Sequence, residues 1–289
     1  MLIPYFLYEA GFHILTEGDP MEELYVIGTG NAMVTSCYNT CFALRKGEEY
    51  FLVDCGGGNT ILKKLHNMQI SIQNIHHIFM THEHCDHTLG FVWLFRLLAS
   101  GMKAGQLTEP VYVYAHEELI STLETLCRLT VQKKFCDYIG KQIFFVPLKN
   151  GDTKDILGLQ VTFFDIESTK AKQFGFTTIL SNGKKLSFTG DEPYHDCCFE
   201  YVRGSDWLLH EAFCMYEDAE RFRPYEKHHS TVKDACELAE RLHVKNMVLW
   251  HTEDKTDITT RKGRYLAEGE LNYSGNLYVP DDEERILLL

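Results

Sequence analysis

The stretch Thr81-His-Glu-His-Cys-Asp-His87 decides the fold of this chain and much of its chemistry. Apolar residues between positions 75 and 80 precede it and predict a buried strand that delivers the cluster to a loop. Residues two apart on an extended segment point to the same side, so His82 and His84 can converge on one metal ion. Asp86 and His87 lie just beyond and can turn toward a second ion. Imidazole and carboxylate ligands suit zinc, manganese or iron, whereas a surface histidine run would explain neither Asp86 nor the preceding strand.

The composition limits the class of protein. The 289 residues, of which 45% are hydrophobic, fit one large domain or two small ones. A formal net charge of -13 disfavours non-specific binding to phosphate backbones. The ten cysteines are scattered without a CxxC pair, and we find neither a signal peptide nor a membrane-spanning segment. We therefore expect a cytoplasmic protein with reduced thiols and no membrane partner.

The apolar pattern indicates an α/β chain, because early strands are joined as hairpins and later strands are separated by helices. Residues 1–22 are predicted to be a short N-terminal extension, and residues 23–289 a single hydrolase domain. Asn182-Gly183 lies between two strand patterns and is a strong hairpin signal. Strands are predicted at 24–27, 41–44, 50–53, 111–114, 143–146, 159–164, 177–181, 185–189, 207–209 and 244–250. Helices are predicted at 60–66, 91–98, 117–129 and 231–242.

Two more candidate ligands follow predicted strands. Binuclear hydrolytic sites place two cations about 3.5–4 Å apart and favour a carboxylate that bridges them. Asp191 follows the strand 185–189 after Gly190, and we interpret it as this bridging ligand, with a turn or helix cap as the alternative role. His251 follows the strand 244–250 and would supply an imidazole to the second ion, with a purely structural histidine as the alternative.

The order and spacing of these pieces resemble the metallo-β-lactamase superfamily. Two further motifs, His210-Glu-Ala-Phe213 and His229-Ser-Thr231, resemble its ribonuclease Z branch, and Arg261 and Tyr265 give weak support. The resemblance covers nearly all of residues 24–289. The superfamily motifs are Gly28-Thr-Gly30, Asp54-Cys-Gly56, the histidine cluster at 81–87, Thr189-Gly-Asp191 and His251.

This resemblance implies a four-layered αββα sandwich with the metal ions at one edge of two facing sheets. It also implies hydrolysis by a metal-activated water and two divalent ions, with zinc favoured over manganese or iron. The implied metal ligands are His82 and His84 for the first ion, Asp86, His87 and His251 for the second, and Asp191 as the bridge. The implied catalytic residues are Asp86, Glu211 and His229.

Glu211 and His229 would form the pair that donates a proton to the leaving oxygen. The chemistry supports this role, because a carboxylate beside an imidazole favours its protonated form and fixes its tautomer. The alternative for His229 is a solvated position next to His228.

The chain departs from the superfamily pattern in its third histidine. No histidine lies between His116 and His195, where the first ion would receive its third imidazole. We expect Glu167 to ligate instead, with Ser168 as the alternative if the register shifts; water could also complete the shell. A glutamate ligand would favour manganese or iron.

A second departure concerns the substrate. Ribonuclease Z carries a long glycine-rich and basic arm that grips transfer RNA, commonly inserted between the third ligand and the bridging Asp. Two predicted strands and their turn fill this interval between Glu167 and Asp191, and residues 99–110 are too short and too weakly basic to replace the arm.

The first hypothesis is therefore a phosphodiesterase of ribonuclease Z-like type, acting on a small phosphodiester or a similar ester. A transfer-RNA 3′-processing endonuclease without the usual arm is one alternative, with RNA as its substrate, and a metal-binding domain with little catalysis is another. A β-lactamase is disfavoured, because the motifs at 210–213 and 229–231 have no place in that reaction. Homodimers are common in the resembled branch, so a homodimer is also an open expectation.

Overall fold

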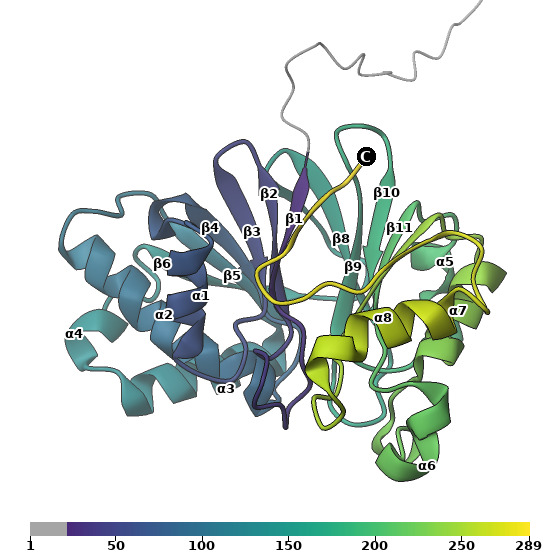
Figure 1. Ribbon diagram of the computed structural model, residues 1–289. Helices are drawn as coiled ribbons and strands as arrows, with labels where there is room; N and C mark the ends of the chain where they lie inside the picture. Colours follow the sequence, from purple (N-terminus) through teal and green to yellow (C-terminus); the bar gives the residue numbers. More distant parts are fainter. Residues whose placement is uncertain (1–21) are drawn as a thin grey trace, which may run out of the picture.

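The computed structural model describes residues 22–289 and consists of two seven-stranded sheets that face each other (Figure 1). The first sheet has the order β14-β1-β2-β3-β4-β5-β6 and the second has the order β13-β12-β11-β10-β9-β8-β7. The first comprises β1 (Glu23–Gly28), β2 (Cys41–Lys46), β3 (Glu49–Val53), β4 (Ile75–Phe79), β5 (Val111–His116), β6 (Ile143–Leu148) and β14 (Arg285–Leu287). The second comprises β7 (Thr153–Ile156), β8 (Leu159–Asp165), β9 (Phe174–Ile179), β10 (Lys185–Phe188), β11 (Trp207–Glu211), β12 (Asn246–Trp250) and β13 (Asn276–Tyr278).

Helices cover the outer face of each sheet and complete four layers (Figure 1). The first sheet is covered by α1 (Thr60–Asn67), α2 (Cys85–Lys103), α3 (Glu117–Thr130) and α4 (Lys133–Cys136). The second is covered by α5 (Phe199–Val202), α7 (Val232–Arg241) and α8 (Ile258–Gly269), while the short α6 (Ala219–Phe222) lies at one end of the molecule.

Strands such as β1, β11 and β12 are buried on both faces because their side chains alternate between two apolar layers. In β1, Leu24 and Val26 join the core between the sheets, whereas Tyr25 and Ile27 join the core under the first set of helices. Aromatic rings dominate the layer between the sheets: the Phe42 ring stacks on that of Trp250 with centroids 4.7 Å apart. This packing fixes the two sheets against each other and so fixes the relative positions of loops from both.

Parallel strands gather the loops of interest at one edge. In the first sheet β3, β4, β5 and β6 run parallel, and in the second β10, β11, β12 and β13 do the same. Carboxyl ends of parallel strands meet at the same edge of a sheet, so residues that follow β4, β10, β11 and β12 can converge.

The predicted four-layered α/β sandwich is confirmed, as is the hairpin at Asn182-Gly183, which joins β9 to β10. One local prediction was wrong: the histidine cluster does not lie wholly on a loop, because α2 begins at Cys85 with His84 as its N-cap. The strands β7, β13 and β14 and the helices α4, α5, α6 and α8 were not predicted. The N-terminal extension lies almost entirely outside the described residues, and the single domain from residue 23 stays a prediction.

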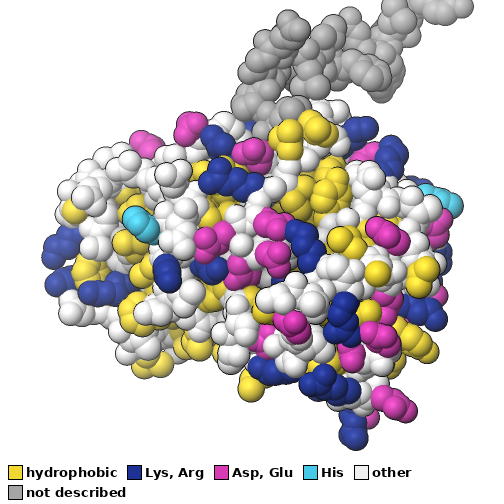
Figure 2. All heavy atoms as spheres, in the orientation of Figure 1, with side chains coloured by type: hydrophobic (Ala, Val, Ile, Leu, Met, Phe, Trp, Pro, Cys, Tyr) yellow, Lys and Arg dark blue, Asp and Glu magenta, His cyan; other side chains and the backbone are white. Residues whose placement is uncertain are grey.

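All ten cysteines fall in the described part and are free thiols. No helix in residues 22–289 is long and apolar enough to cross a membrane. Acidic and basic side chains are intermixed over the face drawn in Figure 2. On that face the residues drawn in colour form no broad basic field of the kind that a nucleic-acid backbone would require.

Candidate metal centre

The predicted ligands come together from both sheets. His82 and His84 follow β4, and Asp86 and His87 lie in the first turn of α2. Asp191 follows β10 and His251 follows β12 immediately. These side chains form two groups in which the ligand atoms lie within 4.8 Å of one another: His82, His84 and Asp191 in the first, and Asp86, His87 and His251 in the second.

Asp191 stands between the two groups. Its Oδ2 atom lies 3.5 Å from the Nε2 atoms of His82, His87 and His251. A single carboxylate oxygen is therefore equally close to nitrogens of both groups, as a bridging ligand requires. All four side chains are almost fully buried.

Asp54 orients His87 toward this centre. Its Oδ2 accepts hydrogen bonds from His87 Nδ1 (2.7 Å) and Thr81 Oγ1 (2.7 Å), and its Oδ1 accepts one from the Thr81 backbone N–H (2.9 Å). With its hydrogen on Nδ1, His87 presents the lone pair of Nε2, which is buried without a hydrogen-bond partner among residues 22–289. A buried, unpartnered imidazole nitrogen is costly unless a ligand takes the place of a hydrogen bond, so the site fits a divalent cation.

The electrostatics keep His82, His251 and Asp191 in their binding forms, whereas His87 differs: burial would lower its pKa, but Asp86 and Asp54 outweigh this and hold the pKa well above its usual value, so a cation would have to displace a proton there. Burial lowers the pKa of His82 well below its usual value and lowers the pKa of His251 to about 4. Burial alone would raise the pKa of Asp191, but the imidazoles of His82, His251 and His87 outweigh it and hold this pKa well below the usual range. Neutral imidazole and ionised carboxylate are the species that coordinate metal ions.

Glu167 does not join either group. It is exposed, on the short segment between β8 and β9, with its backbone N–H bonded to the Asp165 carboxylate. The alternative, Ser168, donates to Glu192 instead. The residue that reaches the centre from this segment is Gln173, whose Nε2 lies 2.8 Å from Asp191 Oδ1 and 2.9 Å from His82 Nδ1. Glu167 has a left-handed backbone conformation, with a φ of 55°.

The second predicted constellation is assembled beside the metal ligands. Glu211 ends β11 and is fully buried; its Oε1 accepts a hydrogen bond from the Ser230 backbone N–H. Its Oε2 lies 3.5 Å from Nδ1 of His229, and neither atom has another partner among the described residues. The His229 ring stacks on Phe213 with a centroid distance of 4.9 Å and lies 5.3 Å from the His251 ring.

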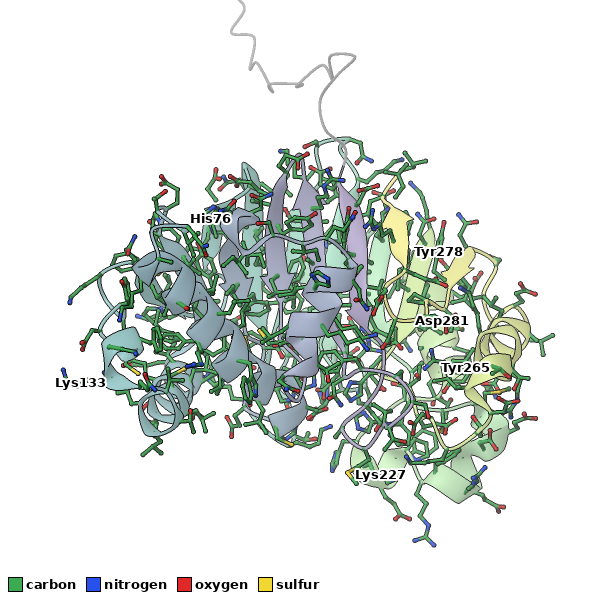
Figure 3. All side chains as sticks on the ribbon, turned by 60° about the vertical axis from the view of Figure 1, so that its left-hand side comes forward. His76, Lys133, Lys227, Tyr265, Tyr278 and Asp281 are labelled. Atoms are coloured by element: carbon green, nitrogen blue, oxygen red, sulfur yellow. The ribbon has the colours of Figure 1, made fainter. Side chains whose placement is uncertain are left out.

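These residues open into a cavity of about 510 Å³. One wall is apolar and includes Met33, Phe213 and Phe222. Three lysines line the cavity: Lys170, Lys227 and Lys255. Lys255 is paired with Asp254 (2.8 Å) and Lys170 with Glu192 (3.8 Å). The Lys227 ammonium lies 5.0 Å from the centre of the Phe213 ring, and Figure 3 shows Lys227 at the lower edge of the molecule. Such a cavity suits a small anionic molecule with an apolar part.

Arg261 and Tyr265 on α8 hold loops beside the centre. Arg261 is buried and donates to Thr252 Oγ1 (2.6 Å), next to His251, and to Asp281 Oδ1 (3.2 Å). The Tyr265 hydroxyl donates to the Phe213 carbonyl (3.2 Å). Figure 3 shows Tyr265 and Asp281 on the same side of the molecule. Both side chains therefore support the site without lining its cavity.

The sequence analysis missed Gln173 and the cavity residues Lys170, Lys227 and Phe222. Lys227 had a signal, since it stands two positions before His229. Gln173 also had one, because it immediately precedes the strand that pairs with β10, the strand that delivers Asp191.

Comparisons with known proteins agree with this fold. The ribonuclease Z of Thermococcus sibiricus is 26% identical and the match covers 93% of this chain and 97% of that protein. Among solved structures, the metallo-β-lactamase fold protein YhfI from Bacillus subtilis has a TM-score of 0.73 at 16% identity, with 93% of this chain and 99% of that chain covered. A diphosphatase from the PhnP family has a TM-score of 0.70 at 16% identity, with coverages of 93% and 98%.

The ribonuclease Z-like resemblance and the metallo-β-lactamase fold are thus confirmed. The family model described as "Anti-Pycsar protein Apyc1" matches residues 22–268, which contain β1 to β12 and every candidate ligand. The chain is a metal-dependent hydrolase with the metallo-β-lactamase fold and belongs to the Anti-Pycsar protein Apyc1 family.

Proposed function

We propose that this protein is a phosphodiesterase that cleaves a small phosphodiester with the help of two divalent metal ions. Zinc is the preferred ion, because a set of imidazoles and carboxylates without thiolate suits it. His82, His84 and Asp191 would hold one ion. Asp86, His87 and His251 would hold the other, with Asp191 shared between them.

The observation that carries this proposal is the position of the His229–Glu211 pair. His229 lies against His251 and lines the same cavity as His84, Asp86 and Asp191. A proton donor beside a two-ion centre suits cleavage of a P–O bond, because the departing alkoxide is a poor leaving group until it is protonated. Bound ions would supply Lewis acidity toward a phosphoryl oxygen and lower the pKa of water.

The surrounding residues have roles that follow from their contacts. Glu211 Oε2 lies 3.5 Å from His229 Nδ1 and would favour a proton on this nitrogen, so Nε2 would be the nitrogen that gives a proton to the departing oxygen. Phe213 keeps the imidazole ring in its plane by stacking. Lys170 and Lys227 line the cavity and would attract the phosphate anion in a protein whose net charge is -13.

The dimensions of the site favour a small substrate over a folded RNA. The interval in which ribonuclease Z would carry its arm is filled by β9 and β10, and the segment from 166 to 173 is a short connection. The cavity volume of about 510 Å³ is within the range of small-molecule sites, roughly 300–1,000 Å³. The similarity to a PhnP-family diphosphatase also supports this reading.

The test is turnover of bis(p-nitrophenyl) phosphate by protein loaded with zinc or manganese. We expect Asp191→Ala to abolish turnover and Asp155→Ala, an exposed carboxylate on β7, to leave it unchanged. p-Nitrophenyl phosphate, a monoester, should be a much poorer substrate. Cleavage of a transfer-RNA precursor without turnover of any small phosphodiester would instead identify an RNA endonuclease, and equal rates for wild type and Asp191→Ala would exclude the proposed centre.

A further inference from the structure

Gln173 is a buried amide that contacts both the first ligand group and the bridging carboxylate. It is 1% exposed and directly precedes β9. Its Nε2 lies 2.8 Å from Asp191 Oδ1. Because an ionised carboxylate can only accept hydrogen bonds, the amide nitrogen must face this oxygen, and Gln173 donates to it.

The backbone beside Asp191 is shaped to admit this amide. Gly190 has a φ of 83°. A Cβ atom at this position would lie 2.9 Å from the carbon and the oxygen of the Gln173 amide group and 3.1 Å from its nitrogen. Any other residue at 190 would therefore displace Gln173. The glycine of the Thr189-Gly-Asp191 motif thus has a specific neighbour here, in addition to its left-handed backbone conformation.

The two oxygens of Asp191 consequently have different partners. Oδ1 receives the Gln173 amide, whereas Oδ2 is the atom that lies 3.5 Å from the Nε2 atoms of His82, His87 and His251. His82 does not depend on Gln173 for its tautomer, because its Nδ1 also lies 2.9 Å from Thr81 Oγ1, which donates to Asp54. Of the two contacts of the Gln173 amide nitrogen, the one to Asp191 Oδ1 is therefore the hydrogen bond whose donor and acceptor are fixed.

We propose that Gln173 is a positioning residue that confines Asp191 to bridging through Oδ2 alone and thereby makes the two metal positions unequal. This inference rests on the proposed two-ion centre. The first position then has only His82, His84 and the shared oxygen, whereas the second has Asp86, His87, His251 and the same oxygen. An ion at the first position would have fewer protein ligands and would therefore bind more weakly.

The asymmetry follows from ligand number and charge. Asp86 gives the second position a carboxylate of its own, while the first has two imidazoles besides the shared oxygen. If Oδ1 were free, it could swing toward the first position and supply a further oxygen. Gln173 prevents this by occupying Oδ1 with a hydrogen bond in a buried setting, where such bonds are strong.

The experiment is stepwise manganese binding to the metal-free full-length protein, followed by calorimetry and by electron paramagnetic resonance. The main variant is Gln173→Met, which keeps the length of the side chain but has no donor. Gln160→Met, an exposed glutamine on β8 bonded to Asp155, is the matched control. Circular dichroism confirms that each variant is folded.

We expect wild type to bind two ions in separate steps and to show the spectrum of a coupled manganese pair at two equivalents. In Gln173→Met the weaker step should tighten by roughly 10- to 100-fold, the size of effect that outer-shell contacts have on metal affinity, while the tighter step is unchanged and the spectrum differs from that of the wild-type pair. A weaker step that loosens instead would contradict the proposed role of Gln173. Gln160→Met should behave as wild type. If Gln173→Met binds two ions with the same affinities as the wild type, the proposed role of Gln173 is overturned. If the wild-type protein binds no ion, the proposed function itself is overturned.

A second measurement decides the matter if Gln173→Met does not fold. Crystals of the unaltered protein with one equivalent of metal should show anomalous density at the position bounded by Asp86, His87 and His251, and density at the first position only with excess metal. Filling in the opposite order, or direct coordination of an ion by Asp191 Oδ1, would contradict the inference.

Discussion

His229 and Glu211 are paired in the structure. We therefore predict that the loss of rate caused by substituting either residue depends strongly on the leaving group of the substrate. His229→Ala removes the proton donor, and Glu211→Gln keeps the shape of the carboxylate but not its charge. A nitrophenolate departs as a stable anion, whereas an alkoxide needs a proton. Both substitutions should therefore slow the hydrolysis of an alkyl phosphodiester far more than that of bis(p-nitrophenyl) phosphate.

The magnitudes follow from the contacts. A positioned general acid contributes about 10²- to 10⁴-fold, and this is the loss expected for His229→Ala with the alkyl substrate. Glu211 Oε2 lies 3.5 Å from His229 Nδ1, and these buried atoms have no other partners among the described residues. A hydrogen bond formed between them once the imidazole is protonated would contribute about 1.5–3 kcal/mol, as a bond to a charged group, so Glu211→Gln should lower the rate by roughly 10- to 100-fold.

The direction of the effect in Glu211→Gln also follows from the structure. The oxygen of the new amide would remain on the Ser230 backbone N–H, which already bonds to Oε1. Its NH2 group would then face His229 Nδ1 and force that nitrogen to accept a hydrogen bond. The imidazole would lose its support as a protonated acid, although the ring would still stack on Phe213.

The assay compares kcat for methyl and p-nitrophenyl phosphodiesters in wild type, His229→Ala, Glu211→Gln and His228→Ala. His228 neighbours His229 but bonds to Thr169, so it is the matched control. Metal content is also measured for each variant. It should equal that of the wild type, because neither His229 nor Glu211 belongs to a ligand group. Equal losses with both substrates, at full metal content, would refute the assignment of this pair as the proton donor.

Three further predictions concern the support of the centre. Asp54→Asn keeps the left-handed backbone (φ 56°), which Asn tolerates, but disturbs the hydrogen bond from His87. Metal affinity measured by calorimetry should therefore fall about 10- to 100-fold. Unchanged affinity would argue against the orientation of His87 by Asp54. The pKa of His251, lowered by burial from 6.5 to about 4, means that between these pH values the unfolded chain binds a proton that the folded chain does not. The free energy of unfolding of the metal-free protein should therefore fall by about 3 kcal/mol as the pH drops through this range, and urea titrations that show less of a fall in His251→Asn would support the assignment. Gly90→Ala would place a Cβ atom 1.8 Å from the Cys55 carbonyl oxygen and should cost about 1–3 kcal/mol in urea unfolding, whereas full stability would show that α2 can move away.

The candidate ligands that follow strands are brought together in the structure. His82, His84, Asp191 and His251 converge because a strand with a buried apolar pattern has a definite end, and the ends of parallel strands meet. The prediction was less accurate for the conformation of the cluster itself. His84 caps α2, and the apolar pattern that begins at Phe91 gave no sign that the helix starts at Cys85.

Short elements at the sheet edges could not be predicted for a related reason. β13 and β14 each have only three residues, too few for an alternating pattern to be distinguished from a loop. β14 forms because it completes the edge beside β1, where Leu24 pairs with Ile286. That pairing joins residues more than 250 positions apart, so it depends on the folded sheet and not on local propensity.

The difference between Glu167 and Gln173 shows where reasoning from residue type alone stops. Glu167 is the better ligand chemically and lies closer to the expected position of the missing histidine, yet its side chain is exposed and joins neither ligand group. Gln173 is a weaker candidate by chemistry, but its place before β9 brings it next to Asp191 at the start of the neighbouring strand pair. Which of two polar residues on one short segment points inward is decided by backbone dihedrals and by the space left at Gly190, and neither can be read from composition or spacing.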